Sequence, residues 1–385
     1  MKSINLKNTL LTIFVIVFTF QSKAQWVNKS FTFGSKVRQY RVYIPSIYNS
    51  ANPASLVITL HGLGDNMTNF SGIGMNLIAD TANFIVIVPQ ALSDPLAGTA
   101  WNSGAGISSY YPNSTIDDVG FLNALIDTAK ANYSINPLRV YLCGFSMGGF
   151  MTERMACESN QKIAAFASVA GTIGSGLSQC NPGRAVPIAH FHGTSDQTVS
   201  YSSNSYGIDA DSLIHFWIAN NQCDTTAIHT NLPDNVADGY TVEHFVYPNG
   251  LQNTEVEFFK VNGADHVYLT LPQNDISYSE EIWKFFNKYQ LLISGINSET
   301  DFKQDINIYP NPANDFINIQ LPQNISNEKI TIQLFNTQSI ELFSKQITGS
   351  NYQLSLSDKN LSNGVYFLRI SCNTKTFIKQ IIILK

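Results

Sequence analysis

The sequence predicts an α/β fold with a mostly parallel central sheet, followed by a small all-β sandwich-like domain. Over residues 25–292, short apolar runs alternate with segments whose apolar residues recur at helical spacing, as in repeated βαβ units. From residue 304 to 385 the chain changes to short alternating stretches separated by turns rich in Asn, Ser and Gly, which is typical of an antiparallel sandwich. Residues 293–303 are polar and unpatterned, and we expect them to form a linker.

The elements of the first domain follow from these patterns. Buried parallel strands are expected at Ser55–Leu60, Phe84–Val88, Val140–Cys143, Ala164–Val169 and Ile188–Phe191. Helices are expected at Val119–Ala131, Ile208–Ile218 and Glu280–Tyr289, and a strand of edge character at Gly239–Tyr247. Each buried strand is followed by Gly, Pro or polar residues, where a loop would leave the carboxyl edge of the sheet.

The first 24 residues have the pattern of an export signal. Lys2 and Lys7 give a positively charged start before an apolar run at residues 10–20. Ser22 and Ala24 then place small residues where a signal peptidase cleaves. We therefore expect a signal peptide at residues 1–24. A membrane anchor is the alternative, although the run is short for a span. No later segment has transmembrane length, so no membrane span is expected in the mature protein.

Composition and cysteine spacing restrict the partners. The net charge is −5 and no run of Lys or Arg could neutralise a row of phosphates, so nucleic acid is not expected as a partner. Neither the five cysteines nor any His/Asp cluster has metal-ligand spacing, so we expect no metal and no other cofactor. An exported protein can form a disulfide, for which Cys157 and Cys180 are the better candidates, and free thiols are the alternative.

The segment Val140–Phe150 carries the strongest chemical signal. A predicted strand runs through Gly144-Phe145-Ser146-Met147-Gly148 into a helical pattern, which is the nucleophile elbow of the α/β-hydrolase fold in the context it requires. Such a tight turn leaves no room for side chains two residues before or after the serine. We therefore interpret Ser146 as a nucleophile, and a glycine-rich structural turn is the alternative.

A serine nucleophile needs a base and an acid that orients the base, and in this fold the acid precedes the base along the chain. Asp196 follows the strand at Ile188–Phe191 and is the expected acid, unless it only caps a turn. His266 lies in a glycine-bearing loop after an apolar strand at Glu257–Val261, which predicts that it is the base. The adjacent Asp265 is expected to face solvent.

Two further loops are expected beside the nucleophile. The glycine-rich loop after Ser55–Leu60 predicts an oxyanion hole formed by the backbone amides of Leu63 and Met147. His61 is expected to order this loop rather than to take part in the chemistry.

The loop Ala100–Ser114 carries three aromatic residues that are candidates for substrate binding. Trp101, Tyr110 and Tyr111 lie in a glycine- and serine-rich stretch after a strand end, and flat aromatic faces suit a feruloyl ring or a pyranose. The alternative for Trp101 is that it packs into the core beneath the loop.

In order and spacing, these motifs resemble those of a known family. HGLGD, Trp101, DDVGF, GFSMGG, HGTSD and GADH, over about residues 30–290, resemble the extracellular esterases that include polyhydroxybutyrate depolymerases, feruloyl esterases and acetylxylan esterases. The resemblance implies that Ser146, Asp196 and His266 form the family's triad. Family members often carry GGGH-x-W around the histidine, whereas this sequence reads GADHVY, with Tyr268 in place of the tryptophan. The resemblance therefore leaves the substrate subclass open.

The tail resembles the C-terminal sorting domain of type IX secretion substrates. The resemblance rests on IYPNPA at residues 308–313, LSNGVY at residues 361–366 and the closing KQI. It implies that type IX secretion machinery is a partner and that the protein travels through the periplasm to the cell surface or the extracellular space, usually with removal of the tail.

Three classes of function are open at this point. We expect a secreted serine carboxylic-ester hydrolase that forms an acyl-enzyme on Ser146 and acts on feruloyl or acetyl esters of plant polysaccharide. Within this first class, a polyhydroxybutyrate depolymerase is the alternative, although solid polyester usually demands an adsorbing module. A serine peptidase would use the same triad but usually needs a cap or propeller. A non-catalytic binding protein would not need to keep all three triad residues.

Overall fold

The computed structural model describes residues 24–177, 180–291, 306–321, 329–336, 341–359, 361–372 and 375–384. The chain divides between Tyr289 and Gln290 into two compact units. The signal peptide expected at residues 1–24 lies, except for Ala24, outside the described residues, as does the linker expected at residues 293–303. Within the described ranges, no helix is long and apolar enough to cross a membrane.

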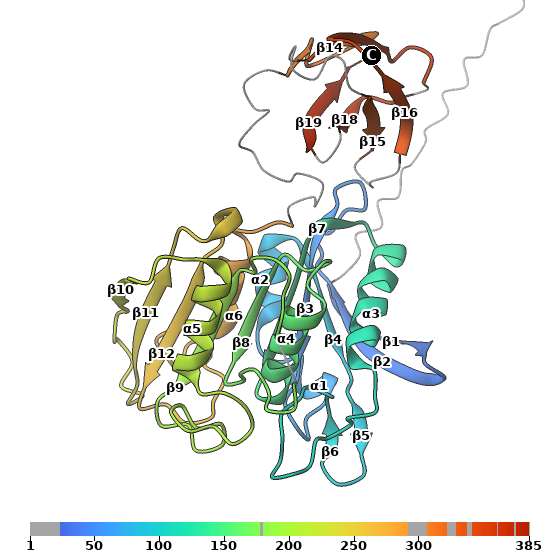
Figure 1. The fold of residues 1–385 in the computed structure, drawn as a ribbon. Helices are drawn as coiled ribbons and strands as arrows, with labels where there is room; N and C mark the ends of the chain where they lie inside the picture. Colours follow the sequence, from blue (N-terminus) through green and yellow to red (C-terminus); the bar gives the residue numbers. More distant parts are fainter. Residues whose placement is uncertain are drawn as a thin grey trace, which may run out of the picture. The chain divides into compact units, whose positions relative to one another are not determined.

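A ten-stranded mixed sheet forms the centre of the first unit, with the strand order β1-β2-β4-β3-β7-β8-β9-β12-β11-β10 (Figure 1). The six central strands, from β4 to β12 in that order, run parallel, and the outer strands pair antiparallel. The strands are β1 Gln25–Phe33, β2 Lys36–Ile44, β3 Ala54–Leu60, β4 Phe84–Pro89, β7 Ile135–Phe145, β8 Ala165–Val169, β9 Ile188–Gly193, β10 Ile228–Asn231, β11 Thr241–Tyr247 and β12 Val256–Asn262.

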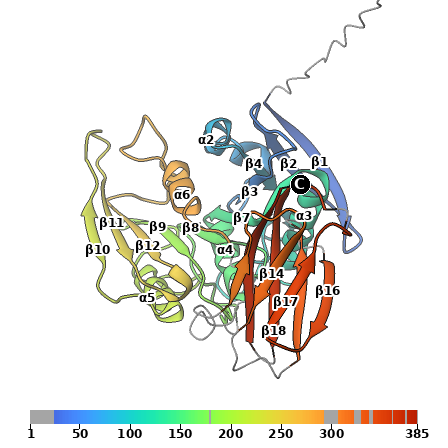
Figure 2. The same ribbon diagram turned by 90° about the horizontal axis from the view of Figure 1, so that it is seen from above.

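Helices cover both faces of this sheet. Figure 2 shows α2 and α6 on one face and α3, α4 and α5 on the other. The helices are α1 Met67–Phe70, α2 Met75–Ala82, α3 Asp118–Asn132, α4 Met147–Glu158, α5 Ala210–Asn221 and α6 Tyr278–Phe286, with a 3₁₀ turn at Leu251–Asn253. A separate small hairpin consists of β5 Leu92–Asp94 and β6 Gly98–Ala100. This three-layer arrangement is the α/β-hydrolase fold that the sequence predicts.

The expected strands and helices are present with bounds that differ by a few residues, and two expectations need correction. The segment Gly239–Tyr247 does not form an edge strand, because β11 lies between β12 and β10. The edge strand on that side of the sheet is β10. All four of its residues are exposed, so its sequence has no apolar alternation. The last helix ends at Phe286 rather than Tyr289.

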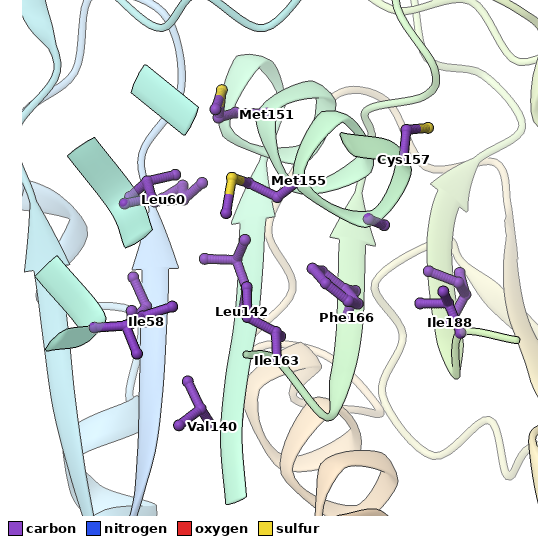
Figure 3. Close-up of a cluster of buried hydrophobic side chains, with 14 of the residues drawn as sticks. Ile58, Leu60, Val140, Leu142, Met151, Met155, Cys157, Ile163, Phe166 and Ile188 are labelled. Atoms are coloured by element: carbon purple, nitrogen blue, oxygen red, sulfur yellow. The ribbon is translucent and has the colours of Figure 1, made fainter. Parts of the chain in front are cut away.

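An apolar layer between the sheet and α4 holds that helix in place. Met151 and Met155 of α4 lie against the strands that carry Leu60 and Leu142 (Figure 3). All four side chains are at most 1% exposed. Burying such a side chain contributes about 1.5–3 kcal/mol, so this layer fixes the helix that begins directly after Ser146.

A disulfide bond joins Cys157, near the end of α4, to Cys180. This is the pairing for which the sequence offered the better candidates. The bond closes a loop with a sequence separation of 23 residues, which restricts the unfolded chain. Cys143 and Cys223 are buried free thiols.

The second unit consists of small antiparallel sheets. One has the order β13-β14-β17 and the other β16-β15-β18-β19. Ile317 and Ile319 from the first sheet share a buried core with Ile332 and Leu368 from the second. The described residues of this unit contain no helix. The strands are β13 Asn307–Tyr309, β14 Phe316–Gln320, β15 Ile330–Phe335, β16 Glu341–Ile347, β17 Asn351–Ser355, β18 Gly364–Cys372 and β19 Lys375–Ile383.

A buried carboxyl group on α4 makes the stability of the first unit depend on pH. Glu153 is 0% exposed, and its Oε2 accepts a hydrogen bond from the Trp217 indole N–H at 2.9 Å. Burial raises the pKa of Glu153 from 4.5 to about 8. The side chain is therefore protonated in the folded protein at neutral pH and ionised in the unfolded chain.

Because the folded-state pKa of Glu153 lies above the unfolded-state value, the free energy of unfolding should fall as pH rises from about 4.5 to about 8. A pKa difference of one corresponds to about 1.4 kcal/mol, so a rise from 4.5 to about 8 corresponds to a total loss of about 5 kcal/mol. Glu153→Gln keeps an acceptor for Trp217 and cannot ionise, so it should remove this slope in urea unfolding experiments between about pH 5 and about pH 8.5. Glu158→Gln, at the exposed end of α4, serves as control and should keep the slope. Equal slopes in wild type and Glu153→Gln would contradict the assignment.

Candidate active site

Ser146 occupies the turn between β7 and α4 in a strained conformation. Its φ of 55° and ψ of −122° are uncommon for a residue with a side chain. The flanking glycines permit the turn, because a Cβ atom at Gly144 would lie 2.2 Å from the Gly148 carbonyl oxygen. A Cβ atom at Gly148 would lie 2.1 Å from the Leu60 carbonyl oxygen. The spacing of these glycines in the sequence therefore reflects direct backbone packing.

Asp196 and His266 meet at the carboxyl edge of the sheet. His266 Nδ1 lies 2.8 Å from Asp196 Oδ2. The other carboxylate oxygen accepts hydrogen bonds from the amides of Thr198 at 2.9 Å and Val199 at 2.8 Å. A carboxylate accepts only, so His266 Nδ1 carries the proton and its Nε2 keeps a lone pair.

The His266 ring lies next to the elbow. Its centroid is 4.8 Å from that of Phe145, the residue directly before Ser146. Among the described residues, the Ser146 hydroxyl makes no hydrogen bond to the His266 ring in this conformation. Hydrogen bonds between nucleophile and base often tighten only when substrate binds. The arrangement places an imidazole that is paired with a carboxylate next to the turn that carries a serine hydroxyl, and acyl transfer uses groups of these three kinds.

The loops that carry Asp196 and His266 are fastened to each other through their backbones. The Ser195 amide donates to the Ala264 carbonyl at 3.0 Å. A Cβ atom at Gly193 would lie 2.3 Å from the same carbonyl oxygen. The distance between acid and base is therefore set by main-chain contacts rather than by flexible side chains.

Asp265 adds a second link that its sequence neighbourhood did not indicate. The residue is exposed, as expected, but its Oδ1 accepts hydrogen bonds from the amides of Gln197 at 2.9 Å and His266 at 2.8 Å. These two donors hold the pKa of Asp265 below its usual value. Asp265 thus joins the acid loop to the base loop across a sequence separation that no local pattern reveals.

The two backbone amides expected to form an oxyanion hole belong to segments next to Ser146. A Cβ atom at Gly62 would lie 3.3 Å from Ser146 Cβ, so the loop that contains Leu63 packs directly against the elbow. Met147 is the first residue of α4, where unpaired amides carry partial positive charge. In the part of the chain that the structure describes, neither amide donates to a side chain or to a turn carbonyl. Their role as donors to an oxyanion stays a prediction.

His61 is buried at the start of the loop that contains Leu63. It is 0% exposed, its Nδ1 lies 2.8 Å from the Gly62 carbonyl oxygen, and its Nε2 accepts from the Ala91 amide at 3.1 Å. Burial lowers the pKa of His61, so the ring is neutral. These contacts fit the structural role that the sequence suggested.

Trp101 does not lie at the surface, and its expected contact with substrate is corrected. The side chain is 0% exposed, and the indole N–H donates to the His61 carbonyl at 2.9 Å. The ring also contacts the His61 ring, with centroids 5.2 Å apart. Trp101 therefore packs into the core and supports the oxyanion loop from beneath, which was the alternative.

Within the described structure, neither tyrosine of the aromatic loop makes a hydrogen bond or a ring contact to Ser146 or His266. The Tyr110 hydroxyl donates to the Asp94 carboxylate at 2.6 and 2.7 Å, which holds the loop to the β5–β6 hairpin. Tyr111 lines a hollow of about 290 Å³ together with Arg154, on the later turns of α4. A substrate role for these tyrosines stays a prediction.

A family model described as phospholipase/carboxylesterase matches residues 44–236. The chain belongs to this family. A second model, the secretion system C-terminal sorting domain, matches residues 307–384 and confirms the sorting tail. Such a tail directs a protein to the cell surface or the extracellular space. No group of three or more His, Cys, Asp and Glu side chains in the described ranges is placed to hold a metal ion.

Curated relatives carry esterase names. A bifunctional acetylxylan esterase/xylanase from Neocallimastix patriciarum is 36% identical over 166 residues, which is 43% of this chain and 22% of that protein. Feruloyl esterase D from Neurospora crassa is 26% identical over 270 residues, 66% of this chain and 83% of that protein. Poly(3-hydroxyalkanoate) depolymerase C from Paucimonas lemoignei is 32% identical over 121 residues, 31% of this chain and 28% of that protein. The chain thus spans less than a third of the length of two of these relatives.

The position of Trp101 can be tested by Trp101→Phe. This change removes the hydrogen bond to the buried His61 carbonyl and should lower the free energy of unfolding by about 1–3 kcal/mol. The KM for a small ester should stay within about twofold, since the ring does not face substrate. Trp283→Phe is the matched control, because Trp283 is only partly buried and stacks on Phe84 away from the elbow. A large rise in KM with unchanged stability would show that Trp101 contacts the substrate.

Proposed function

We propose that the protein is a secreted serine carboxylic-ester hydrolase in which Ser146, His266 and Asp196 act as nucleophile, base and acid. The observation that carries this proposal is the 2.8 Å contact between His266 and Asp196, beside an elbow serine held in a strained turn. Membership of the phospholipase/carboxylesterase family supports it. The sorting tail supports export, and we propose that the route passes through the periplasm with type IX secretion machinery as partner.

In this mechanism Ser146 Oγ bonds to the ester carbonyl carbon while its proton passes to His266 Nε2. Asp196 keeps the imidazole in the tautomer that can accept this proton and stabilises the imidazolium that forms. The amides of Leu63 and Met147 donate to the oxyanion. The carbon–oxygen bond to the alcohol then breaks, and the alcohol leaves with the proton from His266. Water repeats the sequence on the acyl-enzyme and releases the acid.

The proposed substrates are feruloyl or acetyl esters of plant polysaccharide. The names of two relatives, an acetylxylan esterase/xylanase and a feruloyl esterase, support this class. A polyhydroxyalkanoate depolymerase is the second candidate, favoured by the similarity to poly(3-hydroxyalkanoate) depolymerase C. Against it, the only additional unit in the described chain matches a sorting domain rather than a polymer-adsorbing module.

Ser146→Ala tests the assignment of the nucleophile. Removing a serine that acts together with its base typically lowers kcat by about 10⁶, so hydrolysis of p-nitrophenyl acetate should become undetectable. Circular dichroism and thermal unfolding should match the wild type, because Ala fits the turn. Ser203→Ala, an exposed serine in the same unit, is the control and should keep full activity. Substantial activity in Ser146→Ala would show that the elbow is not catalytic.

The substrate class is tested by initial rates on methyl ferulate, acetylated xylan and a polyhydroxybutyrate suspension at equal enzyme concentration. We expect release of ferulate or acetate and little clearing of the suspension, because the one additional unit that the structure describes matches a sorting domain. A peptide anilide included in the same series should not be cleaved. Clearing of the suspension without release of ferulate or acetate would favour the depolymerase.

A further inference from the structure

Two histidines lie beneath Asp196 on β9 and are absent from the mechanism above. His190 and His192 are 0% and 1% exposed. His192 Nε2 lies 2.7 Å from the Val199 carbonyl oxygen and 3.6 Å from Asp196 Oδ2. His192 Nδ1 lies 3.0 Å from His190 Nε2. The pair therefore connects the interior of the sheet to the loop that carries the acid.

The direction of the hydrogen bonds follows from the acceptor at the end of the chain. A carbonyl oxygen only accepts, so His192 Nε2 carries the proton and donates it to Val199. In a neutral ring the other nitrogen, Nδ1, then accepts from His190 Nε2–H. Burial lowers the pKa of both histidines, which keeps the rings neutral. The bonds thus run one way, from His190 through His192 to Val199.

Val199 belongs to the turn that aims the acid. Its amide donates to Asp196 Oδ1 at 2.8 Å, while its carbonyl accepts from His192. One oxygen of the acid is therefore fixed by the turn, and the other, Oδ2, is left to face His266. The His192 ring holds this turn from below. The Tyr201 ring packs edge-on against His192 at a centroid distance of 5.7 Å and restricts the imidazole.

We infer that His192 is a positioning residue of the active site: it pins the Asp196–Val199 turn and so aims the Asp196 carboxylate at His266. A buried imidazole loses hydration that an apolar side chain would not lose, so its presence is explained by the hydrogen bonds that it makes. His190 supplies the hydrogen-bond donor for His192 Nδ1, so both nitrogens of the His192 ring have partners. The inference rests on the proposed function, since it assigns His192 a task within the proposed triad.

The test compares two substitutions of His192. His192→Leu fills the space but removes the donor to Val199, so kcat for p-nitrophenyl acetate should fall about 10²-fold with KM nearly unchanged, as expected when a reacting group is misplaced by about 1 Å. His192→Gln retains an amide that can donate to Val199 and accept from His190, and should recover most of that loss. His244→Leu on β11 is the matched control: it removes another hydrogen-bonded histidine, whose partner is Glu257, and should leave kcat unchanged.

Repeating the measurement in a variant that already carries Asp196→Ala separates positioning from general destabilisation. Because His192 acts through Asp196, the about 10²-fold effect of His192→Leu should disappear when Asp196→Ala is already present. A residue that only fills the core would lower activity by the same factor in both backgrounds. If His192→Leu does not fold, His192→Asn replaces it, because its shorter side chain stays polar without reaching Val199.

The inference is overturned if folded His192→Leu keeps wild-type kcat, if Gln rescues no better than Leu, or if the loss persists in the Asp196→Ala background. Failure of the proposed function has a different signature. In that case Ser146→Ala itself keeps its activity, and the inference is overturned together with the proposed function, because it assigns His192 a task within the triad.

Discussion

The close backbone approach of Gly148 to the Leu60 carbonyl oxygen is the constraint on which the candidate active site depends. At this position a Cβ atom would lie 2.1 Å from that oxygen, so the first turn of α4 packs directly on the end of β3. This close approach places the loop after β3 beside Ser146, which has a positive φ of 55°. Such strain persists only where the surroundings determine the backbone, which here is done by the buried layer under α4.

The acid and base are positioned by the same means on the neighbouring strands. Main-chain contacts fasten the loop after β9 to the loop after β12, and these strands are parallel neighbours in the sheet. Two side chains that contact these loops are buried: Trp101, which donates to the His61 carbonyl, and His192, which contacts the Val199 carbonyl below Asp196. Buried support of this kind restricts the backbone of the loops around Ser146, Asp196 and His266.

The sequence predicted the parts of this arrangement that local patterns encode. Continuous apolar runs located the parallel strands, and Gly144 and Gly148 located the elbow. The acid and base followed from chain order, because Asp196 and His266 come directly after strands. Strands β1, β2 and β10 were not predicted, and the four residues of β10 are all exposed, so its sequence has no apolar alternation.

The remaining errors concern side-chain direction and long-range partners. Whether Trp101 faces solvent or the core depends on the His61 carbonyl, 40 residues earlier in the chain, and no local pattern encodes that contact. Asp265 and His192 are similar cases, because their partners lie on the opposite loop or on the turn above. Local sequence therefore predicted the candidate reacting groups, whereas the residues that contact them became visible only in three dimensions.

The central claim, that Ser146 is the activated nucleophile, is tested most directly by covalent labelling. A fluorophosphonate reacts with a serine hydroxyl that a neighbouring base has activated and that an oxyanion hole faces. Peptide mass spectrometry of the labelled protein should find one adduct, on the peptide that contains Ser146, with loss of esterase activity in proportion to labelling. An adduct on another residue, or full activity after complete labelling of Ser146, would contradict the account.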